Sequence, residues 1–466
     1  MAVPGGRAAL TTIQTGGITS RREATLLSTP TYWYYVLGLL TVSYVANVVD
    51  RSSILAASLQ AIKREFGASD FQMGALTGLP FAIFYSTLGI PIAAWADRSN
   101  RRNVLAMAVA LWSGATAMCG MAVGFAMLFV SRVATAVGEA GGSPPSHSLI
   151  SDYFPKLRRG TAFSIYALAV PIGTSVGSAI GGWGNQHLGW RMTFVMVGLP
   201  GLLLALLVRF TVVEPPRGHA DAAGASVAQD SSAEPSAKAE KAPPLLEVFR
   251  FLAQRASFRH QCLATALHSV VWYAGGAFNN AFLQRSHHLT VAQAGYWISI
   301  FAAVGAIGTF VGGFASDRFS RWADDRRWYL WVPGIATLLC VPFQFGAYMS
   351  PSLSLALPCF AGMMFMAAVF FGPSYSVTQA LATPGMRSVA TSLLLFVQTL
   401  IGQGIGPATA GFISDRFVPS VGTQSLGYAL VLVGMVNIWA AVHYALGART
   451  LRQDLRQTEA LARAAH

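Results

Sequence analysis

Apolar residues along this chain are gathered into long runs, and breaks of polar residues, glycine and proline separate one run from the next. Each run has roughly 20 to 30 residues, the length with which a helix crosses about 30 Å of hydrocarbon. The pattern therefore predicts an all-α polytopic membrane protein with twelve transmembrane helices. The expected spans cover residues 33–58, 70–96, 103–122, 125–148, 160–184, 190–212, 259–283, 291–316, 328–348, 352–381, 388–414 and 424–447.

A segment of different composition separates the sixth predicted span from the seventh. Residues 214–244 are rich in Ala, Pro, Ser, Asp, Glu and Lys, and with almost no large apolar side chains they cannot bury enough surface to fold. Residues 245–258 have the pattern of a short amphipathic helix lying on the membrane surface. The predicted domains are an N-terminal tail (1–32), a six-helix bundle (33–212), a cytoplasmic linker with the amphipathic helix (213–258), a second six-helix bundle (259–448) and a C-terminal tail (449–466).

Two short features occur once in each predicted bundle. An Asp-Arg pair follows the second span at Asp97 and the eighth span at Asp317. Glycines spaced four residues apart begin at Gly173 in the fifth span and at Gly402 in the eleventh. Both separations are close to half the chain length, as expected for two parallel repeats related by an axis along the membrane normal. Such glycine spacing also lets two helix backbones approach closely in lipid.

The composition and the charge distribution agree with a membrane protein. Of the 466 residues 53% are hydrophobic and only 11% are charged, whereas a soluble domain has about 25% charged residues. The net charge is +13, and the Lys and Arg residues concentrate in alternate connections and in both tails. This asymmetry predicts a multi-pass protein of the inner or plasma membrane with both termini in the cytoplasm.

Several other classes of partner are not expected. No basic patch with interleaved stacking aromatic residues occurs, which argues against a nucleic-acid partner. The four cysteines lie inside apolar spans without CxxC spacing, so they indicate neither a disulfide framework nor a metal site. We expect no cofactor and no metal.

Four charged residues lie well inside the predicted spans, away from the span edges, and all four are in the first bundle: Asp50, Arg51, Arg132 and Glu139. A charge at the bilayer centre costs roughly 2.5–3.5 kcal/mol, so these four are expected to face a shared hydrated cavity and to compensate one another. Arg132 and Glu139 are two helical turns apart and therefore lie on one face of the fourth span. Asp50 and Arg51 diverge by about 100°, so one should line the cavity while the other reaches between helices.

These four charges have two interpretations. They would form a substrate and proton site, in which a substrate anion moves an arginine and thereby changes the proton affinity of a neighbouring carboxylate. Alternatively, they are structural ion pairs that fix the register of the helices.

Uncharged and weakly ionisable residues inside the spans add further candidates. His268 lies in the seventh span, and because an unperturbed histidine has a pKa of about 6.5 a proton role is possible, although a lone histidine also serves as a hydrogen-bonded packing residue. Four amides are candidate cavity residues or interhelical hydrogen-bonding residues: Asn279, Asn280, Gln398 and Gln403. Six aromatic residues are candidates for an apolar lining or for ordinary packing: Tyr44, Tyr85, Tyr166, Trp272, Tyr273 and Tyr375.

The charged loops after the second and eighth spans are candidates for gating. An aspartate there can cap a neighbouring helix or pair with a basic residue. An interaction made in only one conformation would act as a gate latch, and the alternative is a set of solvated loop charges. The candidate gating residues are Asp97, Arg98, Arg101, Asp317 and Arg318.

The loop motif, the repeat and the fourth-span arginine together resemble the major facilitator superfamily across essentially the whole chain. Within that superfamily the chain is similar to the spinster-like lipid transporters. The matching pieces are Val49-Asp50-Arg51, Gly138-Glu139-Ala140-Gly141 with Pro144, Asp152-Tyr153-Phe154-Pro155 with Arg159-Gly160, Pro171-Ile172-Gly173, and Ile401-Gly402-Gln403-Gly404-Ile405-Gly406-Pro407 through Ser414-Asp415-Arg416.

The resemblance implies a monomeric secondary transporter, embedded in membrane lipids, whose two halves rock about a central cavity. It also implies proton coupling and an amphipathic substrate, a lysolipid or a sphingolipid-like molecule. By the same resemblance Asp50, Arg51, Arg132 and Glu139 would form the charged end of the cavity for a headgroup. The nearly chargeless second bundle would accommodate an acyl chain.

Two other functions compete with this interpretation. Related organic-anion transporters share the fourth-span Arg-to-Glu pattern, so a small organic anion or a drug-like compound is the alternative substrate. A membrane enzyme is not expected, because no HExxH, GxSxG or GxxxxGK[ST] motif and no paired metal-ligand spacing occurs. A receptor would not need two repeated halves with charges at mid-depth.

Overall fold

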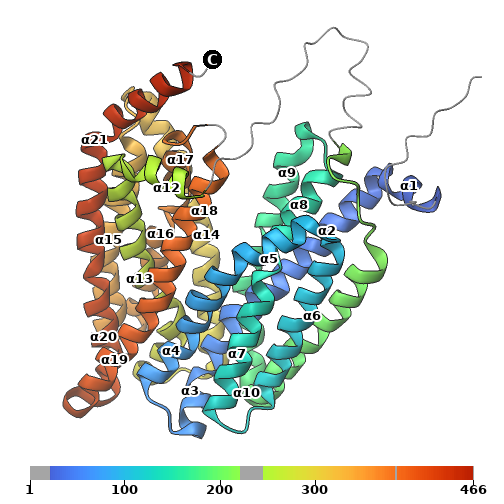
Figure 1. Ribbon diagram of the computed structural model, residues 1–466. Helices are drawn as coiled ribbons and strands as arrows, with labels where there is room; N and C mark the ends of the chain where they lie inside the picture. Colours follow the sequence, from blue (N-terminus) through green and yellow to red (C-terminus); the bar gives the residue numbers. More distant parts are fainter. Residues whose placement is uncertain (1–20, 221–244, 384–385, 465–466) are drawn as a thin grey trace, which may run out of the picture.

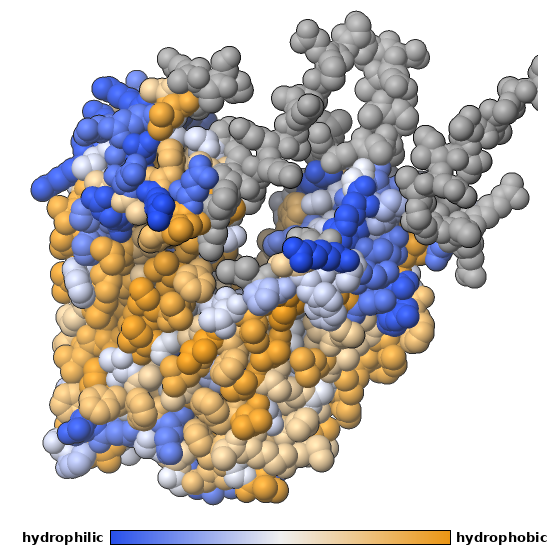
Figure 2. All heavy atoms as spheres, viewed as in Figure 1, coloured by the Kyte–Doolittle hydropathy of each residue, from blue (hydrophilic) through white to orange (hydrophobic). Residues whose placement is uncertain are grey.

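The computed structural model describes residues 21–220, 245–383 and 386–464, and the regular elements in these ranges are all helical. Figure 1 shows the helices in two groups, one built from the first part of the chain and the other from the second. We call residues 21–220 the N-terminal group and residues 245–464 the C-terminal group. Figure 2 shows an apolar surface around the middle of both groups and hydrophilic residues at their two ends.

The N-terminal group runs from a short surface helix into long membrane helices. Its elements are α1 (Arg21–Leu27), α2 (Pro30–Val48), η1 (Val49–Ser53), α3 (Ile54–Phe66), α4 (Asp70–Pro80), η2 (Phe81–Tyr85), α5 (Ser86–Arg98), α6 (Arg101–Gly120), α7 (Phe125–Ala140), α8 (Ser143–Tyr153), α9 (Lys156–Ala167) and α10 (Ala169–Thr211).

The C-terminal group also runs from a short helix into long membrane helices. Its elements are α12 (Leu245–Ala253), α13 (Ala256–Ser286), α14 (Val291–Trp322), α15 (Trp328–Met349), α16 (Leu353–Ala368), α17 (Phe371–Ala380), α18 (Arg387–Val397), η4 (Gln398–Gln403), α19 (Gly404–Val421), η5 (Gly422–Gln424), α20 (Ser425–Gly434) and α21 (Val436–Ala464).

Within the described residues, eight helical stretches are long and apolar enough to cross a membrane. Two of them, Arg158–Thr211 and Val389–Leu461, each contain two predicted spans. The chain turns between those spans at Gly189 and Gly422, whose positive φ angles of 77° and 57° suit glycine. The fourth and seventh predicted spans are helical as well, as α7 with α8 and as α13. All twelve predicted spans are therefore helical.

In the part of the chain that the structure describes, three short π-helical segments interrupt the membrane helices, and the sequence pattern did not predict them. They are η1, η2 and η4. A π turn inserts one residue into an α-helix and changes the direction of the side chains around it, and such turns are frequent at functional sites. In this chain η1 carries Asp50 and Arg51, η2 ends at Tyr85, and η4 ends at Gln403.

The two groups meet tightly at one end of the molecule. Helix α4 crosses α19 so closely that a Cβ atom on Gly74 would lie 2.1 Å from the carbonyl oxygen of Pro407. A Cβ atom on Gly411 would lie 2.1 Å from the carbonyl oxygen of Asp70. We call this end the closed end. The helices α1 and α12 and the last turns of α21 lie at the other end (Figure 1). There the surface is hollowed between the groups (Figure 2), and we call it the open end.

The start of the expected linker and the expected C-terminal tail both pack on the helix groups. Residues 221–244 lie outside the described residues, but the start of the expected linker packs on the N-terminal group through Glu214. The expected C-terminal tail continues α21 as far as Ala464. There Asp454 accepts hydrogen bonds from the main-chain nitrogen of Ser257 at 2.8 Å and from its Oγ at 2.6 Å, so it caps the start of α13.

Candidate functional site

The structure brings Arg132 of α7 into contact with η1, the π-helical turn that carries Arg51. The buried Arg132 on α7 donates from Nη1 to the carbonyl oxygen of Asp50 at 3.1 Å and from Nη2 to that of Arg51 at 2.6 Å. Because η1 is a π turn, its carbonyl groups depart from the regular α-helical pattern and accept these side-chain bonds. Arg132 therefore ties α7 to η1 through the main chain.

Arg51 points away from Asp50 and reaches the other group. Its Nη2 donates to Oε1 of Gln403 on η4 at 2.8 Å. The guanidinium lies 4.7 Å from the ring centre of Tyr85 and 5.0 Å from that of Phe81, within the range of cation–π interaction. Asp50 remains inside the N-terminal group and is only 1% exposed. The two neighbouring residues thus diverge as predicted, and Arg51 is the one that crosses the interface.

Glu139 is a buried carboxyl group with few partners. It is 1% exposed, and within the described residues neither of its oxygens has a hydrogen-bond partner. Asn47 interacts with the carboxyl group but lacks the geometry of a hydrogen bond. Arg51 and Arg132 both exert electrostatic interactions on Glu139, which in turn interacts with Asp50. Since an unsatisfied buried charge is costly, this carboxyl is chemically suited to take up and release a proton.

Tyrosine rings from both groups surround Arg51. Tyr44 and Tyr85 of the N-terminal group and Tyr273 of the C-terminal group all lie within electrostatic range of its guanidinium. Tyr375 lies within the same range of Tyr44 and Tyr273. The arginine is therefore enclosed by aromatic side chains that carry hydroxyl groups.

His268 is not joined to these charges. Its Nδ1 lies 2.8 Å from Oδ1 of Asn437, and its Nε2 lies 2.9 Å from the carbonyl oxygen of Ala367. Its ring also packs edge-on against Phe370. All of these contacts lie inside the C-terminal group, so the geometry fits the packing interpretation of this histidine better than the proton interpretation.

Of the four candidate amides, Gln403 alone is linked to the charged cluster by the contacts that the structure describes. Asn279 accepts a hydrogen bond from the Tyr348 hydroxyl at 2.7 Å, and Asn280 accepts one from Gln284 at 2.6 Å. These two amides connect neighbouring residues within the C-terminal group. Gln398 is buried on η4, and its Nε2 has no partner among the described residues.

The contacts that the structure describes for the candidate gating residues lie within their own groups. The buried Arg101 donates to Glu214 at 2.7 Å and also binds Asp152. Asp317 accepts a hydrogen bond from the Tyr329 hydroxyl at 2.5 Å. Arg98 and Arg318 are exposed, and the side chain of Asp97 lies outside the described part of the chain. No contact that the structure describes for these residues crosses between the groups.

The main polar contact between the groups is one that the sequence did not predict. Asp70, which is fully buried at the start of α4, accepts two hydrogen bonds of 2.6 Å from Arg285 and one of 2.6 Å from Lys63. Ser414 adds a fourth bond at 2.8 Å. Asp415 accepts from the main-chain nitrogen of Asp70 at 2.9 Å and thereby caps α4 from the other group. We call these five residues the closed-end latch.

A sequence signal for the latch does exist. Lys63, Asp70, Arg285 and Asp415 lie at span ends on the side that the positive-inside rule leaves poor in charge. Charges that persist on such a side have to be explained individually. Their sequence neighbours, however, do not indicate that they face one another.

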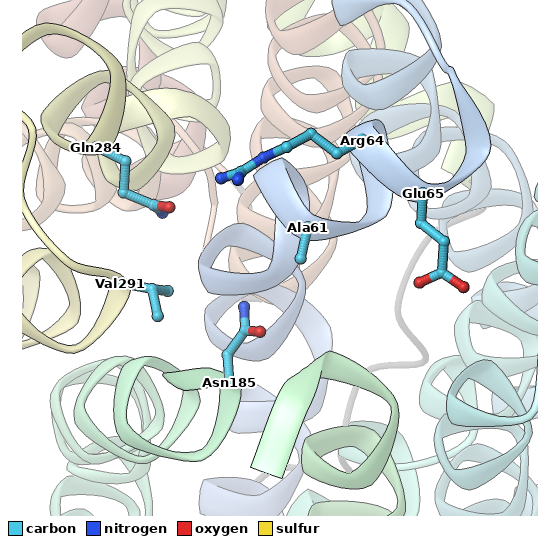
Figure 3. Close-up of a pocket in the computed structure, with 6 residues that line it drawn as sticks. All are labelled: Ala61, Arg64, Glu65, Asn185, Gln284 and Val291. Atoms are coloured by element: carbon cyan, nitrogen blue, oxygen red, sulfur yellow. The ribbon is translucent and has the colours of Figure 1, made fainter. Parts of the chain in front are cut away.

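A cavity of about 460 Å³ lies at the closed end, away from the four in-span charges. Figure 3 shows Arg64, Asn185 and Gln284 extending toward the same space from different helices, while Glu65 points away. Glu65 instead pairs with Arg191 at 2.7 Å. The cavity is therefore separate from the candidate site.

Comparison with known proteins identifies the family. Residues 40–407 and, in a second match, residues 261–464 match the sequence model of the Major Facilitator Superfamily. An MFS-type efflux pump of Mycolicibacterium smegmatis is 29% identical, over 90% of this chain and 93% of that protein. The sphingosine-1-phosphate transporter SPNS2 of Mus musculus is 26% identical, over 91% of this chain and 78% of that protein.

Among solved structures, a bacterial homologue of the human lysosomal transporter Spinster, in an inward-facing and unoccupied conformation, is similar to this chain. It has a TM-score of 0.82 and 32% identity, and the match covers 92% of this chain and 99% of that one. The predicted fold, the predicted family and the expectation that the protein is not an enzyme are thereby confirmed. This chain belongs to the Major Facilitator Superfamily and is a multi-pass secondary transporter that resembles the spinster proteins.

Proposed function

We propose that this transporter carries an anionic amphiphile, a lysolipid or a sphingolipid-like molecule, by proton-coupled alternating access. The observation that carries the proposal is the position of Arg51. This guanidinium stands between the two groups, and its hydrogen bond is to the neutral amide of Gln403. A phosphate or carboxylate would be a stronger partner, because hydrogen bonds between two charged groups are roughly twice as strong as neutral ones.

The surroundings of Arg51 suit a molecule with one charged end. The N-terminal group supplies the four ionisable residues, and the C-terminal group supplies the neutral Gln403 and Tyr273. Trp272, the residue before Tyr273, packs edge to face against Phe371, with the ring centres 5.5 Å apart. A headgroup would bind Arg51, and an acyl chain would lie along the apolar second group.

Proton coupling would follow because the substrate anion and Glu139 both interact with Arg51. Arg51 and Arg132 act electrostatically on Glu139. A substrate anion that draws Arg51 away from its present position changes the field at Glu139 and therefore its affinity for a proton. Binding of the proton changes the affinity for the anion by the same factor, as linkage requires.

We assign the open end to the cytoplasm of the inner or plasma membrane and take the transporter to be a monomer. Both ends of the described chain lie at the open end (Figure 1), together with many of the basic residues. The positive-inside rule places such an end in the cytoplasm.

A second candidate substrate is a small organic anion or a drug-like compound. The specific support for it is the similarity to the Mycolicibacterium efflux pump over 90% of the chain. Such a substrate would use Arg51 and the tyrosines without needing room for an acyl chain.

Flux measurements in proteoliposomes separate these proposals. Purified protein is tested with lysophosphatidate and with a small carboxylate, with and without an imposed pH gradient. We expect saturable, pH-driven movement of the lysolipid, and Glu139→Gln should abolish the response to the pH gradient. Saturable carboxylate uptake without lysolipid movement would transfer support to the second candidate. Unchanged pH-driven flux in Glu139→Gln would overturn the coupling assignment.

A further inference from the structure

A small polar cavity lies inside the N-terminal group, between α2, α6, α8 and α9. Its volume is about 10 Å³, which is close to the minimum that one water molecule needs. The residues that line it are Leu40, Ser43, Tyr44, Asn47, Leu105, Trp112, Gly142, Ser143, Ser146 and Tyr166. The cavity is distinct from the Arg51 contact with Gln403 and from the cavity at the closed end.

Two of the lining residues contact Glu139, although Glu139 itself does not line the cavity. Asn47, one of its lining residues, is the side chain that interacts with Glu139. Gly142, another lining residue, donates its main-chain N–H to the carbonyl oxygen of Glu139 at 3.0 Å, one turn away. Both carboxyl oxygens of Glu139 still lack a hydrogen-bond partner among the described residues.

The lining offers the partners that a water molecule requires. The hydroxyls of Ser43 and Ser146 donate to the carbonyl oxygens of Leu39 and Gly142, each at 2.8 Å, which leaves their oxygen lone pairs free to accept. Trp112 contributes an indole N–H group that has no partner among the described residues. An ordered buried water typically makes about three hydrogen bonds, and this set supplies them.

The far side of the cavity approaches the molecular surface near the open end. Tyr166 stacks on Tyr44 with ring centres 4.8 Å apart and meets the ring of His147 edge-on at 5.3 Å. His147 lies on α8 and is exposed, and α8 and α9 lie toward the open end in Figure 1. Polar side chains thus lead from Glu139 through Asn47 and the cavity to Tyr166 and His147.

We propose that this cavity binds a water molecule that relays protons between Glu139 and the open end, with Asn47, Ser146 and Tyr166 as its positioning residues. In each transfer the water gives one proton to a Glu139 oxygen and accepts one from the side of Tyr166, so one O–H bond breaks as another forms. The groups that face Glu139 are Asp50 and Arg51 on η1, Tyr44 on α2 and Arg132 on α7. The relay does not require any of these four residues to move. The inference rests on the proposed proton role of Glu139.

The test fills the cavity without touching the charges. Ser146→Val replaces a hydroxyl by a methyl group and adds volume where the water would sit, and Tyr166→Phe removes one hydroxyl without adding volume. Ser164→Val is the matched control, because Ser164 lies on α9 with an exposed hydroxyl that donates to Gly160 at 3.0 Å.

The first readout is the rate at which Glu139 is protonated after a pH jump, followed by the infrared carboxyl band that disappears in Glu139→Gln. We expect both cavity variants to slow this rate by about a hundredfold, the low end of what a positioned proton-transfer group contributes, while the final amplitude is unchanged. Substrate exchange at equal pH should remain near the control value, since net proton movement is not required.

The outcomes separate the two proposals. If the band that Glu139→Gln removes is present and neither cavity variant slows its appearance, the relay is wrong and the role of Glu139 stands. If no carboxyl band depends on Glu139, the proposed function fails and the relay fails with it. A loss of exchange together with a loss of thermal stability in Ser146→Val alone would leave Tyr166→Phe as the deciding variant.

Discussion

At the scale of single residues, the two in-span arginines differ in how their charges are satisfied. Arg132 is fully buried and donates to two main-chain carbonyl groups of η1. Arg51 is half-buried and donates to the side-chain oxygen of Gln403. A substrate can displace the Gln403 side chain from Arg51, but it cannot displace the main chain of η1 from Arg132. We therefore propose a structural role for Arg132 in this geometry and propose Arg51 as the residue available to an anion.

The first prediction concerns Arg51. Replacing it by alanine should raise KM for lysophosphatidate by roughly 10- to 100-fold, since a hydrogen bond to a charged group contributes about 1.5–3 kcal/mol. The measurement is concentration-dependent flux in proteoliposomes, and Gln403→Ala serves as the comparison because it leaves the guanidinium in place. An equal loss for an uncharged lysolipid analogue would contradict the assignment of Arg51 to the headgroup.

The second prediction concerns Arg132. Arg132→Ala removes two bonds to buried carbonyl groups and should lower the free energy of unfolding by about 3 kcal/mol or more. Thermal unfolding in detergent should show a clearly larger fall in Tm for Arg132→Ala than for Arg51→Ala. Equal destabilisation by the two substitutions would show that the main-chain contacts of Arg132 are not what supports η1.

At the scale of elements, the two groups approach most closely where glycines leave the helix surface without side chains. Gly74 and Gly78 on α4 lie against the main chain of Pro407 and Gln403, and a Cβ atom would stand 2.1 and 2.2 Å from their carbonyl oxygens. This approach is what allows η2 and η4 to lie side by side and brings Gln403 within reach of Arg51. The small residues of α4 therefore determine the geometry of the charged site as well as the closure of one end.

The third prediction follows from that crossing. Gly74→Ala should push α4 away from α19 and disfavour the closed conformation by about 1–3 kcal/mol, the usual cost of overpacking. Electron–electron distance measurements between spin labels on Arg64→Cys and Tyr296→Cys should show a longer distance at the closed end. Gly114→Ala is the matched control, because a Cβ atom there meets nothing within 4 Å. A distance distribution identical to that of the control would contradict the role of this crossing.

At the scale of the whole molecule, the closed-end latch joins the two groups at one end. At the open end the polar contacts described here lie within each group. Asp70 is fully buried and binds Arg285 from the other group through both carboxyl oxygens. Arg101 at the open end has equally many partners, but they lie in its own group. The molecule is therefore closed at the latch and free to separate at the open end, the arrangement expected for one state of an alternating-access cycle.

The fourth prediction tests the latch. Removing one partner of a buried ion pair costs about 3–5 kcal/mol, so Asp70→Asn should shift the balance between closed and opened latch by roughly 10²-fold or more. The same spin-label pair should then report a second, longer distance. Asp325→Asn is the control, because Asp325 pairs with Arg327 and Arg452 inside the C-terminal group. A longer distance in both variants would indicate general loosening rather than release of the latch.

Several expectations from the sequence were incomplete for an identifiable reason. Residues 214–220 were expected to belong to an unfolded linker, yet Glu214 binds Arg101, since a single carboxylate in polar sequence has no pattern that shows its partner. His268 was a candidate for a proton role because it is an ionisable residue inside a span, and the sequence could not show that its ring nitrogens contact Asn437 and Ala367. The latch was missed because Asp70 and Arg285 are 215 positions apart.

The sequence by itself determined the apolar spans, the repeated halves, the family and the four charges placed within the membrane. These properties depend on run length, composition and the cost of burying a charge, and each of them is local to the chain. Only the tertiary structure decided that Arg51 meets Gln403 across 352 positions, that Arg132 binds a main-chain turn, and that Asn47, which interacts with Glu139, lines a polar cavity. The reason is physical: a π turn rotates side chains out of the regular helical register, and the partner then depends on how two separate bundles pack.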